Sequence, residues 1–308
     1  MPRVIAANDP KAIGLGDLVD IVETGRFDAR DEACFASFGP ALADLAANRD
    51  FLADIIVAEL KDRCRSQSVR NAYGPQVVML HAGRNFIVRA NFWPAETDPV
   101  LQENGPEAFF YHRPHDHNFS FLTVGYTGPG YWSDYYEFDY DACVGAVGDA
   151  VDLRFVERSR LSRGKVLLYR AHRDIHAQLP ADALSVSLNI MERAPHIGYR
   201  DQYGFDVSNG VISENLTETA IEPLLAICSQ IGGENARDLV ETYAAYHPSE
   251  RIQFAALTAL ASTCPSIDAR IEVFAQAARR SAPFVARMAA RQCAAINAGR
   301  HWITRTAH

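Results

Sequence analysis

The alternation of apolar and polar positions divides the chain into zones of different secondary structure. Up to about residue 75 the apolar residues recur at helical spacing. In residues 51–60, for example, Phe51, Leu52, Ile55 and Ile56 fall on one helical stripe, with Asp54 on the other side. Residues 1–75 are therefore predicted to form an N-terminal helical segment whose apolar faces cover another part of the protein.

From residue 76 to 195 the pattern changes to that of strands. Short runs rich in β-branched and aromatic residues are separated by Gly, Pro, Asn and Asp, with no long helix between them. The runs are residues 76–80, 85–93, 108–112, 117–126, 130–140, 150–161, 165–171 and 183–191. They predict a β-barrel or double-sheet jelly roll, and the turn at 127–130 (TGPG) predicts a hairpin between two of its strands.

After a connector at residues 196–217, residues 218–308 are alanine-rich and predicted to be helical. Two stretches resemble each other, and their pairs Ala255-Ala256 and Ala289-Ala290 lie 34 residues apart. This pattern is typical of HEAT-like repeats, and a plain helical bundle is the alternative. The predicted fold class is α+β: a β-barrel or jelly roll flanked by an N-terminal helical segment and a C-terminal HEAT-like helical domain that packs on the barrel or on another subunit.

Composition narrows the classes of function. The 308 residues carry a formal net charge of −8, which gives no support for nucleic-acid binding. No run approaches the roughly 20 apolar residues of a membrane span, and the first residues lack the layout of a signal peptide. The six cysteines are far apart with no CxxC pair, as in reduced thiols, so we expect a cytoplasmic protein without membrane partners.

Two histidines in the strand zone indicate a metal site. His115 and His117 are two residues apart on a predicted strand, so both side chains leave the same face. That face continues with Phe119, Phe121 and Thr123, which suit the lining of a barrel. Two histidines at the start of an apolar lining need a partner for their ring nitrogens, and imidazoles so placed can bind one metal ion at about 2.0–2.1 Å.

A third ligand is expected from residues 164–191, which supply His172 and His176. Strand alternation does not separate positions four apart, so either could be the ligand and the other a hydrogen-bond partner behind it. The triplet at 172–174 also matches the HxD pattern of 2-oxoglutarate-dependent oxygenases. That interpretation needs a later histidine on another strand, and His196 lies only 22 residues beyond Asp174.

These residues resemble the motifs of the cupin superfamily. PHDH at 114–117 is similar to its first motif, and residues 164–189 to its second. The arrangement of HDH, a distant histidine and a strand reading SVSLNIM is similar to thiol dioxygenases of the cysteine dioxygenase type, over residues 86–191. The resemblance implies that His115, His117 and His176 hold Fe(II).

The chain departs from the family pattern where most cupins have a glutamate after the second histidine. Those positions are Phe121 and Leu122, and Glu137 is the nearest acid of that kind. Pairing the predicted hairpin about its turn points Asp134 and Tyr136 inward and Glu137 outward, although one bulge would reverse this. A three-histidine site is thus expected, with Glu137 as an alternative fourth ligand.

The substrate of cysteine dioxygenase is not implied. The arginine that holds its carboxylate corresponds to Val77 or Val78, its cross-linking cysteine corresponds to Leu122, and its tyrosine has no counterpart near Met191. Candidate residues for catalysis and binding therefore come from this chain's own pattern. Acid–base or hydrogen-bonding roles are assigned to Asp134, Tyr136 and His172, and substrate binding to Arg89, Arg113 and Arg170.

The function predicted from the sequence is that of a mononuclear non-haem Fe(II) oxygenase. Its partners would be dioxygen and a small polar or amino-acid-like substrate, free or carried on a protein or peptide, and the protein could form a homodimer. With Zn²⁺ or Mn²⁺ in place of iron, the same ligands would suit an isomerase or hydrolase. A third hypothesis is a non-catalytic sensor whose barrel binds a metal or ligand and whose helices bind a protein.

Overall fold

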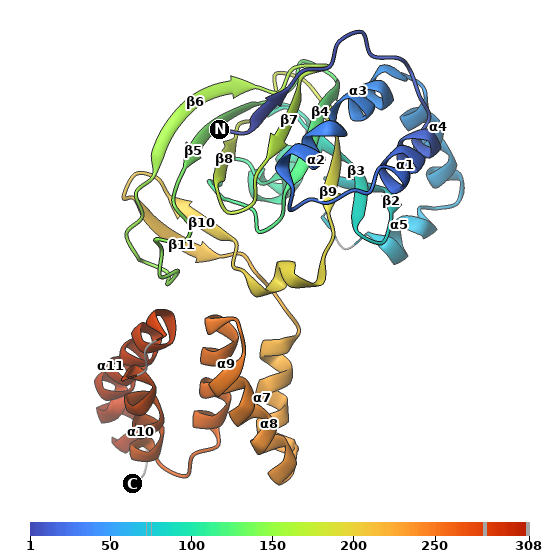
Figure 1. Ribbon diagram of the computed structural model, residues 1–308. Coiled ribbons are helices and arrows are strands. Elements are labelled where there is room, and N and C mark those ends of the chain that lie inside the picture. Colours follow the sequence, from blue (N-terminus) through green and yellow to red (C-terminus); the bar gives the residue numbers. More distant parts are fainter. Residues whose placement is uncertain (72, 75, 280–281, 306–308) are drawn as a thin grey trace. The chain divides into compact units, whose positions relative to one another are not determined.

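The structure is a computed structural model that describes residues 1–71, 73–74, 76–279 and 282–305 (Figure 1). They form two compact units. The first unit comprises Met1–Tyr140, Ala150–Ile197 and Gln202–Asn215. The second comprises Asp141–Asp149, Gly198–Asp201 and the described chain from Leu216 onward.

Antiparallel sheets form the framework of the first unit. The largest has the strand order β1-β7-β4-β9-β3-β2, the second β6-β5-β8, and β10 pairs with β11. The strands are β1 (Arg3–Ile5), β2 (Val77–Ala82), β3 (Phe86–Trp93), β4 (Phe121–Thr127), β5 (Trp132–Glu137), β6 (Arg154–Arg160), β7 (Val166–Tyr169), β8 (Asp174–Gln178), β9 (Ser185–Glu192), β10 (Tyr203–Asp206) and β11 (Val211–Asn215).

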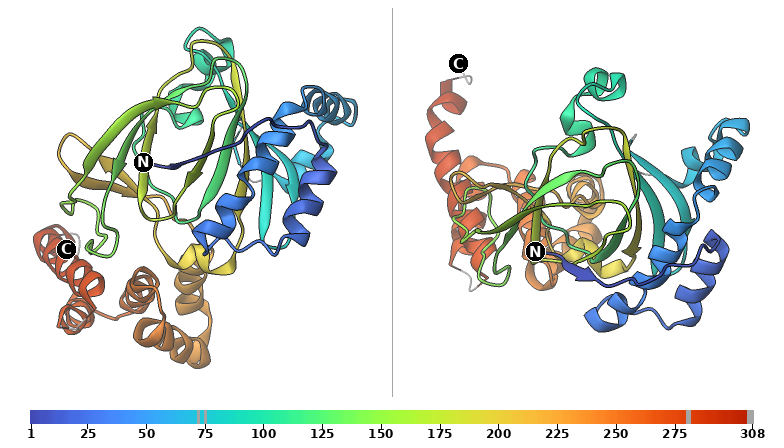
Figure 2. Two further views of the ribbon diagram at one scale, coloured as in Figure 1. Left: turned by 45° about the horizontal axis from the view of Figure 1, so that its top comes forward. Right: turned by 90° about the horizontal axis from the view of Figure 1, so that it is seen from above.

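Helices of the first unit cover the outer face of the six-stranded sheet (Figure 2). They are α1 (Leu15–Thr24), α2 (Glu32–Ser37), α3 (Gly39–Ala47), α4 (Phe51–Lys61) and α5 (Arg65–Arg70). Strands β4 and β9 place Leu122, Leu188 and Ile190 against them, all fully buried. The alternate residues Phe121 and Met191 face the opposite side and join a second apolar core. The helices predicted in residues 1–75 thus pack with their apolar faces on one side of this sheet.

The space on the inner face of the six-stranded sheet is closed by β6-β5-β8, and we call these two sheets the barrel. Tyr135 on β5 and Tyr169 on β7 share its core, with their hydroxyl groups 3.0 Å apart. This mixed arrangement of helices and antiparallel sheets agrees with the α+β class predicted from the sequence. The chain between β3 and β4 also contains a short helix, α6 (Pro99–Asn104), which the sequence pattern did not predict.

The strand predicted at residues 108–112 is wrong. Residues Pro106–Phe109 form a 3₁₀ turn, η1, and the chain then turns at Phe110 and His112, whose φ angles are 56° and 58°. Proline at the first position favours a helical turn, and positive φ is incompatible with an extended strand. The run thus forms no continuous strand, and within it Tyr111 makes an isolated bridge to Gln178 on β8.

The hairpin predicted about residues 127–130 is also wrong. β4 pairs with β7 and β9, whereas β5 pairs with β6 and β8, so the turn leads from one sheet to the other. Gly128 and Gly130 have φ angles of +79° and +82°. A Cβ atom on Gly130 would lie 2.0 Å from the carbonyl oxygen of Leu161, so only glycine fits this corner.

The segment that the sequence suggested as a connector contains structure of its own. A 3₁₀ turn, η2 (Pro195–Tyr199), precedes the β10–β11 hairpin. Backbone hydrogen bonds from Asp116 to Tyr203 (3.1 Å) and from Phe205 to Pro114 (2.9 Å) attach this hairpin to the segment that carries the HDH motif. The hairpin therefore supports the histidine segment from one side.

The second unit is helical in its described residues from 216 onward. Its helices are α7 (Ile221–Ile231), α8 (Gly233–Tyr246), α9 (Glu250–Ser262), α10 (Ile267–Ala278) and α11 (Pro283–Arg305). Ala256 and Ala289, one from each alanine pair, are fully buried in its core. Small side chains let the helices approach closely, but assignment to the HEAT class remains a prediction. Over the described residues, no helix has the length and apolar character to cross a membrane.

Candidate metal centre

The histidines of the HDH motif meet a third histidine from a remote part of the chain. His115 and His117 lie in an irregular extended segment just before β4, and His176 lies in β8. The backbone N–H of His115 donates to the carbonyl of His176 (3.1 Å), and that of His176 donates to the carbonyl of His115 (3.0 Å). This antiparallel pair places the two side chains next to each other.

The ring nitrogens of the three histidines converge. His176 Nε2 lies 3.0 Å from His117 Nε2 and 3.2 Å from His115 Nε2. All three side chains are buried, and one potential ligand atom from each lies within 4.8 Å of the others. We call this group the imidazole cluster.

The spacing of the imidazole cluster fits a shared metal ion. Nitrogen atoms about 2.0–2.1 Å from one ion, at angles of about 90–110°, lie about 2.9–3.4 Å apart. Without an ion, three buried nitrogen atoms would face each other with too few protons between them to satisfy all three. His117 Nδ1 also has no hydrogen-bond partner among the described residues. The three residues therefore fit a metal ion.

Burial keeps the cluster in the neutral form that metals bind. It lowers the pKa of His115 to about 4, although the hydrogen bond to the Arg113 carbonyl acts in the opposite direction. Burial, followed by the neighbouring histidines, lowers the pKa values of His117 and His176 well below the usual range. His115 Nδ1 lies 2.7 Å from the carbonyl oxygen of Arg113 and donates its proton there, so the lone pair is on Nε2.

Gln178, two residues after His176 on β8, lies beside the cluster. Its amide Nε2 is 3.1 Å from His176 Nδ1 and 3.0 Å from His176 Nε2. The side chain is 3% exposed, and its Oε1 is buried without a hydrogen-bond partner among the described residues. With the amide turned by 180°, Oε1 could accept the Nδ1 proton of His176 and orient that ring for a metal ion.

A cavity of about 240 Å³ opens beside the cluster and includes the three histidines in its wall. Most of its surface is apolar, and its aromatic lining residues are Tyr73, Trp93, Phe110, Phe119, Phe121 and Tyr131. The polar part is formed by Gln76, Arg89, Asn91, Gln178, Asn189 and Gln202. An apolar cavity with a few polar groups beside potential metal ligands is the usual form of a small-molecule site.

Among the arginines predicted to bind substrate, Arg89 lines this cavity and Arg113 does not. Arg113 instead forms a two-point ion pair with Glu214 on β11, with N···O distances of 2.9 and 2.6 Å. A guanidinium already held by a carboxylate is not available to an anionic substrate. The prediction for Arg113 is therefore corrected: its backbone carbonyl supports His115, and its side chain joins the hairpin to the histidine segment.

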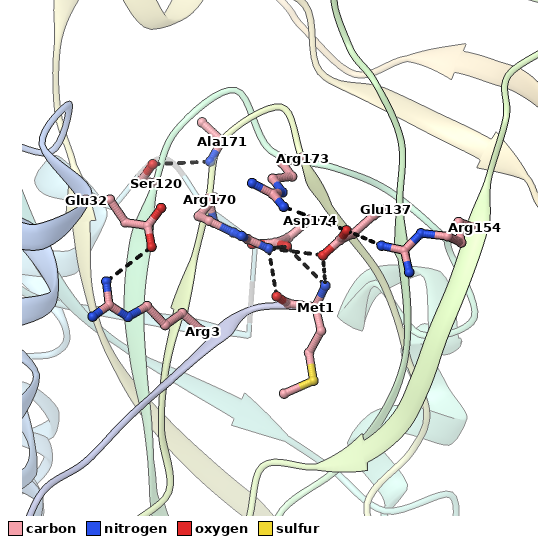
Figure 3. A network of polar contacts seen from close by, with 10 residues as sticks. All are labelled: Met1, Arg3, Glu32, Ser120, Glu137, Arg154, Arg170, Ala171, Arg173 and Asp174. Carbon is pink, nitrogen blue, oxygen red and sulfur yellow. Dashed lines mark hydrogen bonds and ion pairs between the residues drawn. The ribbon is translucent and has the colours of Figure 1, made fainter.

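The substrate-binding role predicted for Arg170 is also corrected. Its guanidinium contacts Asp174 (2.5 Å), Glu137 (3.2 Å) and the carbonyl oxygen of Met1 (2.8 Å), as Figure 3 shows. The Met1 amino group completes this group of charges, 2.5 Å from Glu137 and 3.4 Å from Asp174. We call these residues the arginine network. Since Asp174 lies two residues before His176, the network anchors the strand that carries the third histidine.

Glu137, the alternative fourth ligand, belongs to the arginine network and not to the imidazole cluster. Its register partner is Asp174, next to the Tyr135–His176 pair, so it faces the same side as Tyr135 and not outward as predicted. Burial alone would raise the pKa of Glu137, but the Met1 amino group and then Arg173 and Arg170 lower it to about 2.

The inward orientation predicted for Asp134 and Tyr136 is also wrong. The hairpin on which it was based does not form, and β5 places Ser133 and Tyr135 in the interior. Asp134 pairs instead with Arg158, at 2.5 and 2.7 Å. Tyr136 packs on the half-exposed ring of Phe155. Neither side chain lines the cavity, so neither is placed to act as acid or base there.

His172 lies behind the cluster, outside the cavity wall. Its backbone, with φ of 58°, turns before β8, and its N–H donates to the carbonyl of His117 (2.8 Å). The side-chain Nδ1 is 3.8 Å from Oδ2 of the buried Asp116. The direct catalytic role predicted for His172 is therefore replaced by a positioning role for the HDH segment.

Sequence reasoning missed several residues of the cavity wall, notably Trp93, Asn91, Asn189 and Gln178. A signal was present in SVSLNIM, where Ser185, Ser187 and Asn189 alternate with apolar residues. In a strand covered on both faces, polar residues on one face indicate a polar cavity. Which face of this strand lines a cavity depends on the neighbouring strands, which the pattern of one strand does not specify.

Neither a protein-family model nor a curated protein sequence matches the chain. Solved structures that are similar to parts of this chain include a cupin domain from Bordetella pertussis Tohama I. The two sequences are 14% identical, the match covers 40% of this chain and 96% of the cupin domain, and the TM-score is 0.24. Hydroquinone 1,2-dioxygenase from Sphingomonas sp. TTNP3 has 12% identity, coverage of 42% and 71%, and a TM-score of 0.27.

The DMSP lyase DddQ from Ruegeria pomeroyi DSS-3 is a further similar structure. Its identity is 11%, its coverage 45% of this chain and 64% of the lyase, and its TM-score 0.24. The structural neighbours thus include a cupin domain and a dioxygenase. At such TM-scores the chemistry of this chain has to be inferred from its own imidazole cluster and cavity.

Proposed function

We propose that this protein is a metal-dependent cupin-type enzyme, a mononuclear non-haem Fe(II) oxygenase that acts on a small polar or amino-acid-like substrate. The observation that supports this is the convergence of three buried, neutral imidazoles at one point in the wall of a cavity. Three nitrogen ligands occupy only part of a metal's coordination sphere, so positions remain open toward the cavity.

His115, His117 and His176 would hold the metal ion. Ferrous iron, when bound, supplies the one-electron redox chemistry that reactions with dioxygen require. The imidazoles are neutral, so they leave the positive charge of the site uncompensated and favour an anionic substrate. The carbonyl of Arg113 and the amide of Gln178 keep the rings oriented.

The aromatic wall of the cavity has a separate role. Phe119 and Phe121 pack directly on His117, with ring centroids 4.8 and 4.9 Å away. Trp93 and Tyr131 pack on each other at 4.0 Å on the same wall. Such surfaces exclude water from the reacting groups, which an oxygenase needs in order to direct its oxidant to the substrate.

Oxygen consumption tests this function. The protein is prepared metal-free, loaded with Fe(II) or Zn²⁺, and supplied with panels of small carboxylic acids, amino acids and thiols. We expect one bound metal ion per chain and substrate-dependent oxygen uptake with Fe(II) only. The His176→Ala variant should lose both properties, while His196→Ala, a change at a half-exposed histidine outside the cluster, should keep them.

Turnover of a substrate with Zn²⁺ and without oxygen uptake would contradict the oxygenase and favour an isomerase or hydrolase. Metal binding without turnover of any panel compound, together with a stable protein complex in cell extract, would favour the sensor hypothesis. Metal content that is the same in the His176→Ala variant and the parent protein would disprove the metal site itself.

A further inference from the structure

Arg89 is a buried cation without an acidic partner. It lies on β3 with 9% exposure, and its guanidinium stacks on the ring of Tyr73 at 4.7 Å. Its Nε has no hydrogen-bond partner, and no carboxylate lies within 4.0 Å of it in the part of the chain that the structure describes. Buried charges in proteins are usually paired, because removing an ion from water costs several kcal/mol.

The residues beside Arg89 form a row of polar groups across three strands. Asn189 on β9 is the register partner of Arg89 on one side and of Thr123 on the other, so the three side chains face the same way. Thr123 Oγ1 is buried without a hydrogen-bond partner among the described residues. Asn189 donates to the Oδ1 of Asn91 at 3.0 Å. We call Thr123, Asn189 and Arg89 the polar row.

Two members of the polar row, Arg89 and Asn189, line the same cavity as the imidazole cluster. Arg89, Asn91 and Asn189 line it together with the three histidines. Among the described lining residues Arg89 is the sole Lys, Arg, Asp or Glu. The cavity wall thus combines one fixed positive charge, two amides and potential metal ligands with aromatic side chains.

We propose that Arg89 binds the carboxylate of a small monoanionic substrate and that Asn91 and Asn189 orient the group next to it. This inference rests on the proposed function, whose substrate class it narrows. The planar guanidinium matches a carboxylate in two-point geometry. A single guanidinium offers one such two-point contact, which suits one carboxylate group.

The same wall discriminates against a free zwitterionic amino acid. An ammonium group needs acceptors and, when buried, a negative charge, and the lining residues named above include no carboxylate. The aromatic side chains instead suit an uncharged body between the carboxylate and the imidazole cluster. The substrate class is therefore a small carboxylic acid whose remaining part is uncharged.

Binding to the metal-free protein, measured by isothermal titration calorimetry, tests this inference without metal or turnover. The probes share one skeleton: 3-phenylpropionate, its neutral amide and the zwitterion phenylalanine, with propionate and propionamide as smaller counterparts. We expect each acid to bind roughly 10–100-fold more tightly than its amide, as hydrogen bonds to a charged group imply. Phenylalanine should bind more weakly than 3-phenylpropionate.

Variants identify the residue responsible. Arg89→Met should abolish the preference for acid over amide, and Arg89→Lys should keep part of it. Arg158→Met removes a guanidinium that lies outside the cavity wall, and should leave the preference unchanged. Thermal unfolding of each variant checks that it is folded.

Equal binding of acids and amides, no binding of either acid, or a preference that survives Arg89→Met would overturn the inference. Carboxylate binding that occurs only after Zn²⁺ is added would also overturn it, because the metal and not Arg89 would then be the anion site. Failure of the proposed function would give a different result. If the metal site is wrong, the parent protein and the His176→Ala variant will have the same metal content, while the preference for acid over amide persists.

Discussion

Two groups of charged and polar side chains in the barrel differ in whether their charges are paired. In the arginine network, Arg170 contacts Glu137 and Asp174, and the Met1 amino group and Arg154 also contact Glu137 (Figure 3). At the cavity, Arg89 has no acidic partner among the described residues, and the imidazole nitrogens face one another. β8 contributes to both groups, through Asp174 and His176.

This difference indicates which group serves stability and which serves binding. Breaking a buried ion pair by removing one partner is strongly destabilising, because the other charge is left uncompensated. A buried charge or lone pair without a partner is destabilising unless a ligand completes it. We therefore interpret the arginine network as the support of β8 and the cavity as the ligand site.

The largest expected effect is in the arginine network. Asp174→Ala removes a fully buried carboxylate from Arg170 and should lower the free energy of unfolding by about 3–5 kcal/mol, measured by urea denaturation. Asp134→Ala, which breaks the more exposed pair with Arg158, should change it by less than about 1 kcal/mol. Equal effects of the two changes would show that the network does not support the strand.

Acidification should weaken the same network. The pKa of Glu137 is about 2 against a usual value of 4.5, so its contribution is fully present above pH 4.5 and is lost as the pH falls toward 2. The lowered pKa of Glu137 contributes up to about 3 kcal/mol to the free energy of unfolding. Unfolding titrations between pH 5 and 2 should show a flatter profile for Glu137→Gln than for the parent protein.

The next effect concerns metal affinity. His115→Ala or His176→Ala removes one of three ligands and should lower the affinity for Fe(II) or Zn²⁺ more than about 100-fold, since changes behind the ligands alone cost 10–100-fold. Gln178→Leu removes a group that supports a ligand, so it should lower the metal affinity by about 10–100-fold. Competition with a chelator measures all three, and unchanged affinity in the His176 variant would contradict the cluster.

The smallest expected effect has the opposite sign. Arg89→Met replaces an unpaired buried charge with an apolar side chain, so the stability should stay the same or rise by about 1 kcal/mol. Arg170→Met should instead destabilise the protein, because it removes the guanidinium that contacts the fully buried Asp174 at 2.5 Å. Urea denaturation of the two variants compares them directly; a large loss of stability for Arg89→Met would mean that Arg89 has a structural partner.

Local pattern was sufficient for much of the fold. The strands at 85–93, 165–171 and 183–191 were predicted from β-branched and aromatic runs, because a strand between two cores needs such residues on both faces. The apolar stripe around Phe51 likewise indicated a covering helix. Errors arose where glycine or positive φ redirected the chain, as at Gly130 and Phe110.

What the sequence by itself determined was the type of chemistry: His115 and His117 in one motif, with His172 or His176 as a third. Which of the two joins them was decided by the backbone pairing of His115 with His176, a contact across 61 residues. The role of each arginine side chain also depends on the tertiary structure. Arg89, Arg113 and Arg170 are chemically identical, and only the tertiary structure supplies two of them with carboxylates and leaves the third facing a cavity, because charge pairing depends on distances that the order of residues does not specify.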